Sequence, residues 1–103
     1  MSLESMYQTL RAQASRTEEP RGQTLTGGAR ITVRVRDGRT TLTISRKNKP
    51  VGASELETFR AACSVPPDAE RSPSEGQKLY TDDAGVVWHY LSFRFAEPEG
   101  EST

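Results

Sequence analysis

The chain has 103 residues, of which 33% are hydrophobic and 27% charged, and its 14 Lys and Arg residues balance 14 Asp and Glu residues. This length fits one small domain, and the lack of a long apolar run excludes a transmembrane helix. A single cysteine and a single histidine exclude an internal disulfide and a four-ligand Cys/His zinc site. Because the N-terminus lacks the basic and apolar segments of a signal peptide, we expect a soluble cytoplasmic protein.

Charge is distributed unevenly along the chain. Residues 30–60 contain eight basic and three acidic side chains, whereas residues 61–103 contain three basic and eight acidic ones. The two halves either neutralise each other in the folded domain or form separate faces with different partners. The sequence leaves both interpretations open.

Apolar residues at helical spacing predict a short N-terminal helix over about residues 3–14, with Ser2 as its cap. A helix of this length needs packing to be stable in water. We therefore expect it to dock on the domain, on another subunit or on a partner. The residues on its apolar side are Leu3, Met6, Tyr7, Leu10 and Ala14.

The segment that follows this helix is polar and rich in glycine. In residues 15–29 the only large apolar side chain is Leu25, which predicts a flexible linker. We therefore expect residues 1–28 to form a helical arm with its linker, residues 29–96 to form a single domain, and residues 97–103 to form a disordered acidic tail.

Alternation of apolar and polar residues predicts a β-hairpin over residues 30–46. A two-residue Asp-Gly turn at positions 37–38 would pair Val33 with Leu42, and this register places the apolar residues of both strands on one face. The opposite face would then carry basic and hydroxyl side chains, namely Thr32, Arg34, Arg36, Arg39, Thr41, Thr43 and Ser45.

A capping-box pattern predicts a helix that begins after Ser54, with Glu57 at its third position. Leu56, Phe59 and Cys63 would lie on one side of this helix. We expect that side to pack against the apolar face of the sheet.

A second hairpin is predicted near the C-terminus. Residues 77–81 can pair with residues 86–90 through a four-residue turn at 82–85, and the last strand can continue to Phe95. The sequence therefore predicts a small α+β domain whose antiparallel sheet has two hairpins in the order β-β-α-β-β, with one packed helix and an N-terminal amphipathic helix.

The last predicted strand is apolar on both sides. Leu91 and Phe93 share one face, and Trp88 and Tyr90 share the other. If the first face packs against the helix, Trp88, Tyr90 and, across the turn, Leu79 need a cover. The N-terminal helix, a second copy of the chain or a ligand could supply that cover.

Catalytic and cofactor motifs are missing from the sequence. Cys63 and His89 are joined by no local motif for nucleophilic catalysis, and the glycines at 27–28 precede a strand, unlike those of a phosphate-binding loop. Asp82 and Asp83 lack the spacing of a calcium loop and are read as turn residues. We therefore expect a non-enzymatic protein without metal or cofactor.

Two binding functions remain. The first prediction is a small accessory, regulatory or inhibitor protein, for example of a phage or mobile element, that binds a protein partner or itself through the aromatic last strand and the N-terminal helix. The residues predicted for this interface are Trp88, Tyr90, Leu79, Tyr7 and Leu10.

The alternative is nucleic-acid binding through the basic face of the first hairpin, with phosphate contacts from its arginines. The zero net charge and the acidic second half of the chain oppose this alternative. The residues predicted for it are Arg34, Arg36, Arg39, Arg46, Lys47 and Lys49.

Overall fold

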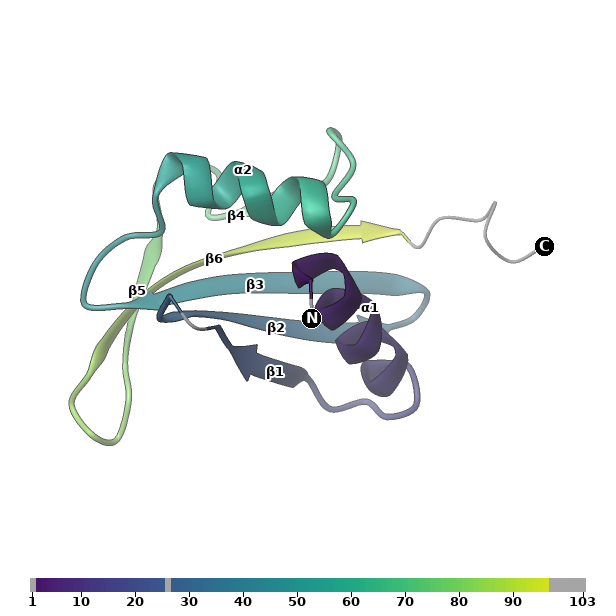
Figure 1. Cartoon of the computed structure of the whole chain (residues 1–103), viewed down its shortest axis with the longest axis horizontal. Coiled ribbons are helices and arrows are strands. Elements are labelled where there is room, and N and C mark those ends of the chain that lie inside the picture. The colour runs from purple at the N-terminus through teal and green to yellow at the C-terminus, as the bar shows by residue number, and fades with distance from the viewer. Residues whose placement is uncertain (1, 26, 97–103) are drawn as a thin grey trace.

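The computed structural model describes residues 2–25 and 27–96, and it has two helices on one side of an antiparallel sheet (Figure 1). The predicted α+β class is confirmed, and the predicted tail at 97–103 lies outside the described residues. Neither helix of the described chain is long and apolar enough to cross a membrane. The elements are α1 (Leu3–Ala14), β1 (Arg21–Thr24), β2 (Ala29–Arg36), β3 (Arg39–Lys47), α2 (Ala53–Ala62), β4 (Glu70–Ser72), β5 (Lys78–Thr81) and β6 (Val87–Ala96).

The sheet is larger than the two predicted hairpins. Its strand order is β1-β2-β3-β6-β4, and β5 also pairs with β6 beyond the end of β4. The simple β-β-α-β-β order is therefore wrong, because β1 and β4 add strands that the hydrophobic pattern does not reveal. Both are short and polar, and backbone pairing alone places them in the sheet.

The first hairpin has the predicted register. Val33 pairs with Leu42, and Arg36 pairs with Arg39 across the turn. Asp37 and Gly38 have φ values of 54° and 75°, as a type I′ turn requires.

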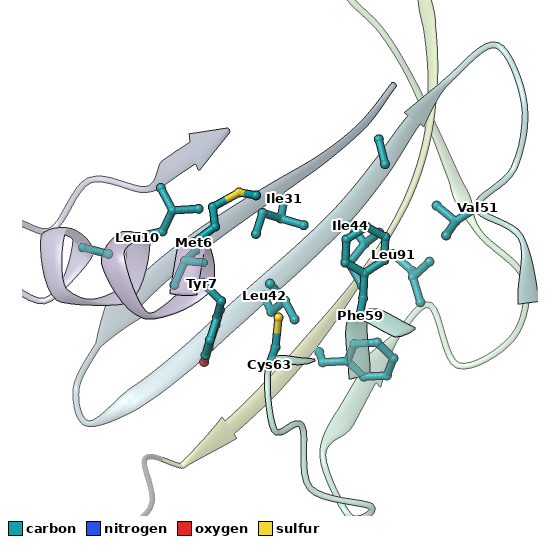
Figure 2. Packing of buried hydrophobic residues seen from close by; sticks show 14 of the residues in the cluster. Met6, Tyr7, Leu10, Ile31, Leu42, Ile44, Val51, Phe59, Cys63 and Leu91 are labelled. Carbon is teal, nitrogen blue, oxygen red and sulfur yellow. The ribbon is translucent and has the colours of Figure 1, made fainter. Parts of the chain in front are cut away.

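The hydrophobic core lies between the sheet and the two helices (Figure 2). Ile44 pairs with Leu91 at the centre of the sheet, and both side chains are fully buried. Phe59 of α2 is buried over this face, as predicted. The other buried apolar residues of the strands are Ala29, Ile31, Val33, Leu42, Phe93 and Phe95.

Helix α1 packs on the same side of the sheet as α2, against β2 and β1. Tyr7 and Leu10 are only 2% and 5% exposed, because they fill the part of the core that α2 does not reach. Both side chains belong to the core and are not exposed for the predicted protein interface. The helix also leaves the face of Trp88 and Tyr90 uncovered.

Part of the predicted linker is the strand β1. Arg21–Thr24 pairs with β2, and the connection is closed by hydrogen bonds from Leu25 N–H to Ala29 O (2.7 Å) and from Gly28 N–H to Leu25 O (3.0 Å). All four residues of β1 are exposed. Because their side chains bury nothing, no alternation marks this strand in the sequence.

The segment between α2 and β5 contains the strand β4. Arg71 then holds the following turn by donating to Ser74 O and Gly76 O, each at 3.0 Å. The side-chain amide of Gln77 accepts from Val51 N–H and donates to Val51 O, both at 2.9 Å. These contacts order a segment that looks unstructured by composition.

Helix α2 begins two residues earlier than predicted, with Gly52 as its N-cap. The carboxylate of Glu55 accepts from Gly52 N–H (3.4 Å) and from Arg46 Nη1 (2.9 Å). Glu55 therefore takes the place predicted for Glu57, because it alone can bridge the first turn of the helix to β3.

The second hairpin differs from the prediction by one residue. Asp82 N–H donates to Val86 O, which leaves a three-residue loop with Gly85 at φ 83°. Leu79 consequently pairs with His89, and Tyr80 pairs with Trp88. Because side chains alternate along a strand, this shift moves Leu79 to the face opposite Trp88 and puts Tyr80 in its place.

We expect Ile44→Ala to lower the free energy of unfolding by about 2–5 kcal/mol, because it leaves a cavity at the centre of the sheet. Leu79 is 64% exposed, so Leu79→Ala should change stability by no more than about 0.5 kcal/mol. Urea unfolding of both variants measures the difference. Equal losses in the two variants would contradict the described packing.

Candidate binding face of the sheet

The face of the sheet that points away from both helices is called here the open face. On this face lies every second residue of each strand, beginning with Arg30 in β2, Arg39 in β3 and Trp88 in β6. Its basic residues are Arg30, Arg34, Arg36, Arg39, Lys47, Lys78 and Arg94, whereas Glu70 is the acidic residue that the described strands place there. The open face is therefore strongly cationic although the chain is neutral.

One end of the open face is hollowed into a trough of about 490 Å³. Its floor consists of Thr32, Thr43 and Ser45 from β2 and β3. One wall is aromatic and consists of Tyr80, Trp88 and Tyr90 from β5 and β6. Arg30 and Thr24 form the opposite wall, and Lys47 closes one end.

Trp88 is held in the aromatic wall from two directions. Its indole Nε1 donates to Asp82 Oδ2 at 3.0 Å. The ammonium group of Lys47 lies 5.5 Å from the centre of the indole ring, within the range of a cation–π contact. The ring orientation is therefore set by a carboxylate in the hairpin loop and by a cation on the adjacent strand.

Asp82 organises the loop as well as the wall. Its Oδ1 accepts from the backbone N–H groups of Ala84 (2.9 Å) and Val86 (3.0 Å). The hydrogen bond from Trp88, together with these backbone bonds and the charge of Lys47, lowers the pKa of the Asp82 carboxyl below its usual value. The ionised carboxylate is thus the form that the folded hairpin stabilises.

Arg30 lies across β1 because Gly22 leaves room for it. Its Nη1 donates to Thr24 Oγ1 at 3.1 Å. A Cβ atom at position 22 would lie 2.9 Å from Arg30 Nη2, which is closer than real Cβ atoms come, and 3.1 Å from both Ile31 O and Thr32 Oγ1, which is tighter than most real contacts. The glycine therefore permits the guanidinium group to occupy this wall of the trough.

The floor of the trough is small and polar. Thr43 Oγ1 and Ser92 Oγ share a hydrogen bond of 2.9 Å, and Ser45 Oγ donates to Arg30 O at 3.4 Å. A hydroxyl group retains acceptor capacity after one bond of this kind. The floor can therefore hydrogen-bond a ligand while its short side chains leave space above them.

The other end of the open face carries Arg34, Arg36, Arg39 and Arg94, beyond the trough. Arg39 lies 3.9 Å from Glu70, a long contact between exposed groups. Arg34 Nε is buried without a hydrogen-bond partner among the described residues. This end offers cationic donors without aromatic rings.

The residues predicted for nucleic-acid binding do not all lie on the open face. Arg34, Arg36, Arg39 and Lys47 share the open face, but Arg46 lies on the helix side, where it pairs with Glu55. Residue parity along β3 directs Arg46 toward α2, so it does not belong to the open face. Lys49 follows the end of β3 and belongs to none of the strands.

Two important residues of the trough, Arg30 and Tyr80, were missed in the sequence. Arg30 has the same parity as Arg34, so extending the alternation by one step identifies it. Tyr80 depends on the length of the hairpin loop, which the pattern Asp-Asp-Ala-Gly leaves ambiguous by one residue.

Cys63 lies in the core beneath α2, away from the open face. Its burial raises the pKa of the thiol to about 12, so the thiol is protonated at neutral pH. In residues 2–25 and 27–96, no three His, Cys, Asp or Glu side chains gather as metal ligands do.

Comparison with known proteins adds nothing to this geometry, since no protein-family model, no curated protein and no solved structure matches the chain.

We expect Asp82→Asn to free the Trp88 indole while leaving the fold intact, because an amide can still accept from the loop N–H groups but its nitrogen cannot accept from Nε1. Trp88 is the only tryptophan, so its fluorescence anisotropy should fall. Asp83→Asn removes the same charge from the same loop and should leave the anisotropy unchanged. An unaltered signal in Asp82→Asn would contradict the role assigned to this carboxylate.

The same bond predicts a pH dependence. The folded pKa of Asp82 is lowered, so its stabilising effect is present above the unfolded value of about 3.9 and is lost as pH falls through the lower folded value. Trp88 fluorescence of the wild type should stay constant from pH 7 to about pH 4 and change below that. Asp82→Asn should lack this acid transition, and a transition shared by both proteins would contradict its assignment to Asp82.

Proposed function

We propose that the open face binds single-stranded nucleic acid. The observation that supports this most directly is the convergence of two groups of residues that lie apart in the sequence. The arginines of β2 and the aromatic residues of β5 and β6 share the one sheet face that neither helix covers.

Charge segregation weakens the objection from composition. Glu55 and Glu57 belong to α2 on the other side of the sheet, whereas Glu70 lies on the open face beside Arg94 and Asp82 accepts a hydrogen bond from Trp88 in the hairpin loop. The face itself keeps its excess of arginine and lysine. A neutral chain can therefore attract phosphate groups locally, because a binding surface responds to its own charge pattern.

Aromatic side chains on a cationic sheet favour single strands over a duplex. Unpaired bases can stack on tyrosine or tryptophan, whereas paired bases in a helix are already stacked on each other. Tyr80 is 57% exposed, and Trp88 and Tyr90 are half-buried in the same wall. The arginines beyond the trough would extend the contact to neighbouring phosphates.

The protein interface predicted from sequence receives less support as a whole. Tyr7 and Leu10 are buried in the core, and Leu79 is on the opposite face. The remaining members, Trp88 and Tyr90, line the same trough as Arg30 and Lys47. Their surroundings suit an anionic ligand with rings better than an apolar protein surface.

We expect a fluorescently labelled single-stranded oligonucleotide to bind at low salt and to be released as salt rises. The logarithm of the affinity should fall linearly with the logarithm of salt concentration, by about 0.7 per neutralised phosphate. In the double variant Arg34→Glu, Arg36→Glu the affinity should fall at least tenfold and the salt slope should become shallower. Fluorescence anisotropy titrations at several salt concentrations measure both quantities.

A charge-matched control is available on the other side of the molecule. Arg60 belongs to α2, and Arg21 has the parity of the helix side in β1. The double variant Arg21→Glu, Arg60→Glu should bind like the wild type. Absence of binding at low salt, or equal losses in the two double variants, would refute the proposal.

A second candidate is self-association through the free edge of β5. Leu79 is 64% and Tyr80 57% exposed, and these are the large hydrophobic side chains that the described chain leaves exposed. Strand β5 pairs with β6 on one side, so its outer edge can accept a strand from a second copy. This candidate keeps Leu79 as an interface residue.

Self-association predicts a solution mass above that of the monomer at micromolar concentration. Leu79→Asp should shift the mass to that of the monomer, because it places a charge in the contact. Thr58→Asp, an exposed position on α2, should not. Light scattering that finds only monomer for the wild type would eliminate this candidate and leave the nucleic-acid proposal untouched.

A further inference from the structure

The trough differs from the rest of the open face in shape and in chemistry. Its volume of about 490 Å³ lies within the range of small-ligand pockets, roughly 300–1,000 Å³. The arginines at the other end of the face line no part of it. A feature of this size fits one small molecule, or one residue of a polymer, better than a length of chain.

The charges that line the trough select an anion. Arg30 and Lys47 contribute to its lining, and none of the acidic side chains in residues 2–25 and 27–96 does. Arg30 uses one of its five donors in the bond to Thr24, so others can reach a phosphate oxygen. An uncharged sugar or peptide would make no use of these two cations.

The aromatic wall selects a planar ring. Trp88 is anchored by Asp82, Tyr80 is its direct partner across the strands, and Tyr90 continues the same face. A bare inorganic anion would make no use of three rings. A ligand that uses both walls carries an anionic group and a flat ring, and nucleotides combine the two.

We propose that the trough is a mononucleotide pocket, with the base against the aromatic wall, its edge above the hydroxyl floor and its phosphate beside Arg30 and Lys47. This inference rests on the proposed nucleic-acid function and narrows it. The trough holds one nucleotide of a bound strand, and a free nucleoside monophosphate binds in the same place.

Gly22 is a positioning residue for this pocket. A Cβ atom at position 22 would crowd the Arg30 guanidinium group most closely and Ile31 O and Thr32 Oγ1 less closely, and none of its three nearest atoms belongs to the aromatic wall. Gly22→Ala should therefore weaken binding of a phosphorylated ligand and leave binding of the corresponding nucleoside little changed. Measuring both ligands with the wild type and with Gly22→Ala separates the contribution of the phosphate from that of the ring.

The test follows Trp88 fluorescence during titration with AMP, adenosine and inorganic phosphate. AMP should change the signal saturably and bind more tightly than either fragment. Tyr80→Ala should weaken AMP binding about tenfold through loss of ring stacking. Its control is Leu79→Ala, an exposed neighbour on the opposite face of the same strand, which should bind AMP like the wild type.

The outcomes separate this inference from the proposed function. If oligonucleotides bind but AMP fails at millimolar concentration, the pocket is refuted and the proposed function stands. If inorganic phosphate binds as tightly as AMP, or if Leu79→Ala loses as much affinity as Tyr80→Ala, the base does not occupy the trough and the inference is refuted. If neither AMP nor oligonucleotides bind, both proposals fail.

Discussion

The antiparallel pairing of β3 with β6 is the contact on which the rest of the structure depends. These strands are paired from Arg39 and Ala96 to Lys47 and Trp88, and they form the centre of the sheet. On one side the pairing stacks Ile44 and Leu91 beneath the helices, where both are fully buried. On the other side the same register puts Lys47 beside Trp88. One set of backbone hydrogen bonds therefore positions the core and the trough together.

The two faces of the sheet are stabilised differently. The helix side buries apolar side chains and excludes water, which is the main stabilising contribution in a domain of this size. The open face contributes little burial and is ordered by polar contacts such as Asp82 with Trp88 and Thr43 with Ser92. Its residues can therefore change with less loss of stability, because their cationic and aromatic side chains contribute little to the core.

Local sequence patterns predicted much of the fold. The alternation around the Asp-Gly turn identifies the first hairpin and its register, because a two-residue turn allows a single pairing. The polar strands β1 and β4 escaped detection, since they join the sheet through backbone bonds and bury almost nothing. The second hairpin was misplaced by one residue because Asp82 closes its loop through its own carboxylate, a contact that composition does not reveal. That single residue decides whether Leu79 or Tyr80 faces the trough.

The sequence by itself determined the α+β class, the first hairpin, the approximate positions of both helices and the presence of a basic segment and an aromatic strand. These follow from periodicity, turn residues and local composition, which act over a few residues. Only the tertiary structure decided that both helices cover the same face, that Tyr7 and Leu10 belong to the core, and that Arg30 faces Trp88 across the floor formed by β2 and β3. The reason is physical: strand order and helix placement depend on long-range burial and pairing, and they bring together side chains that are 58 positions apart in the chain.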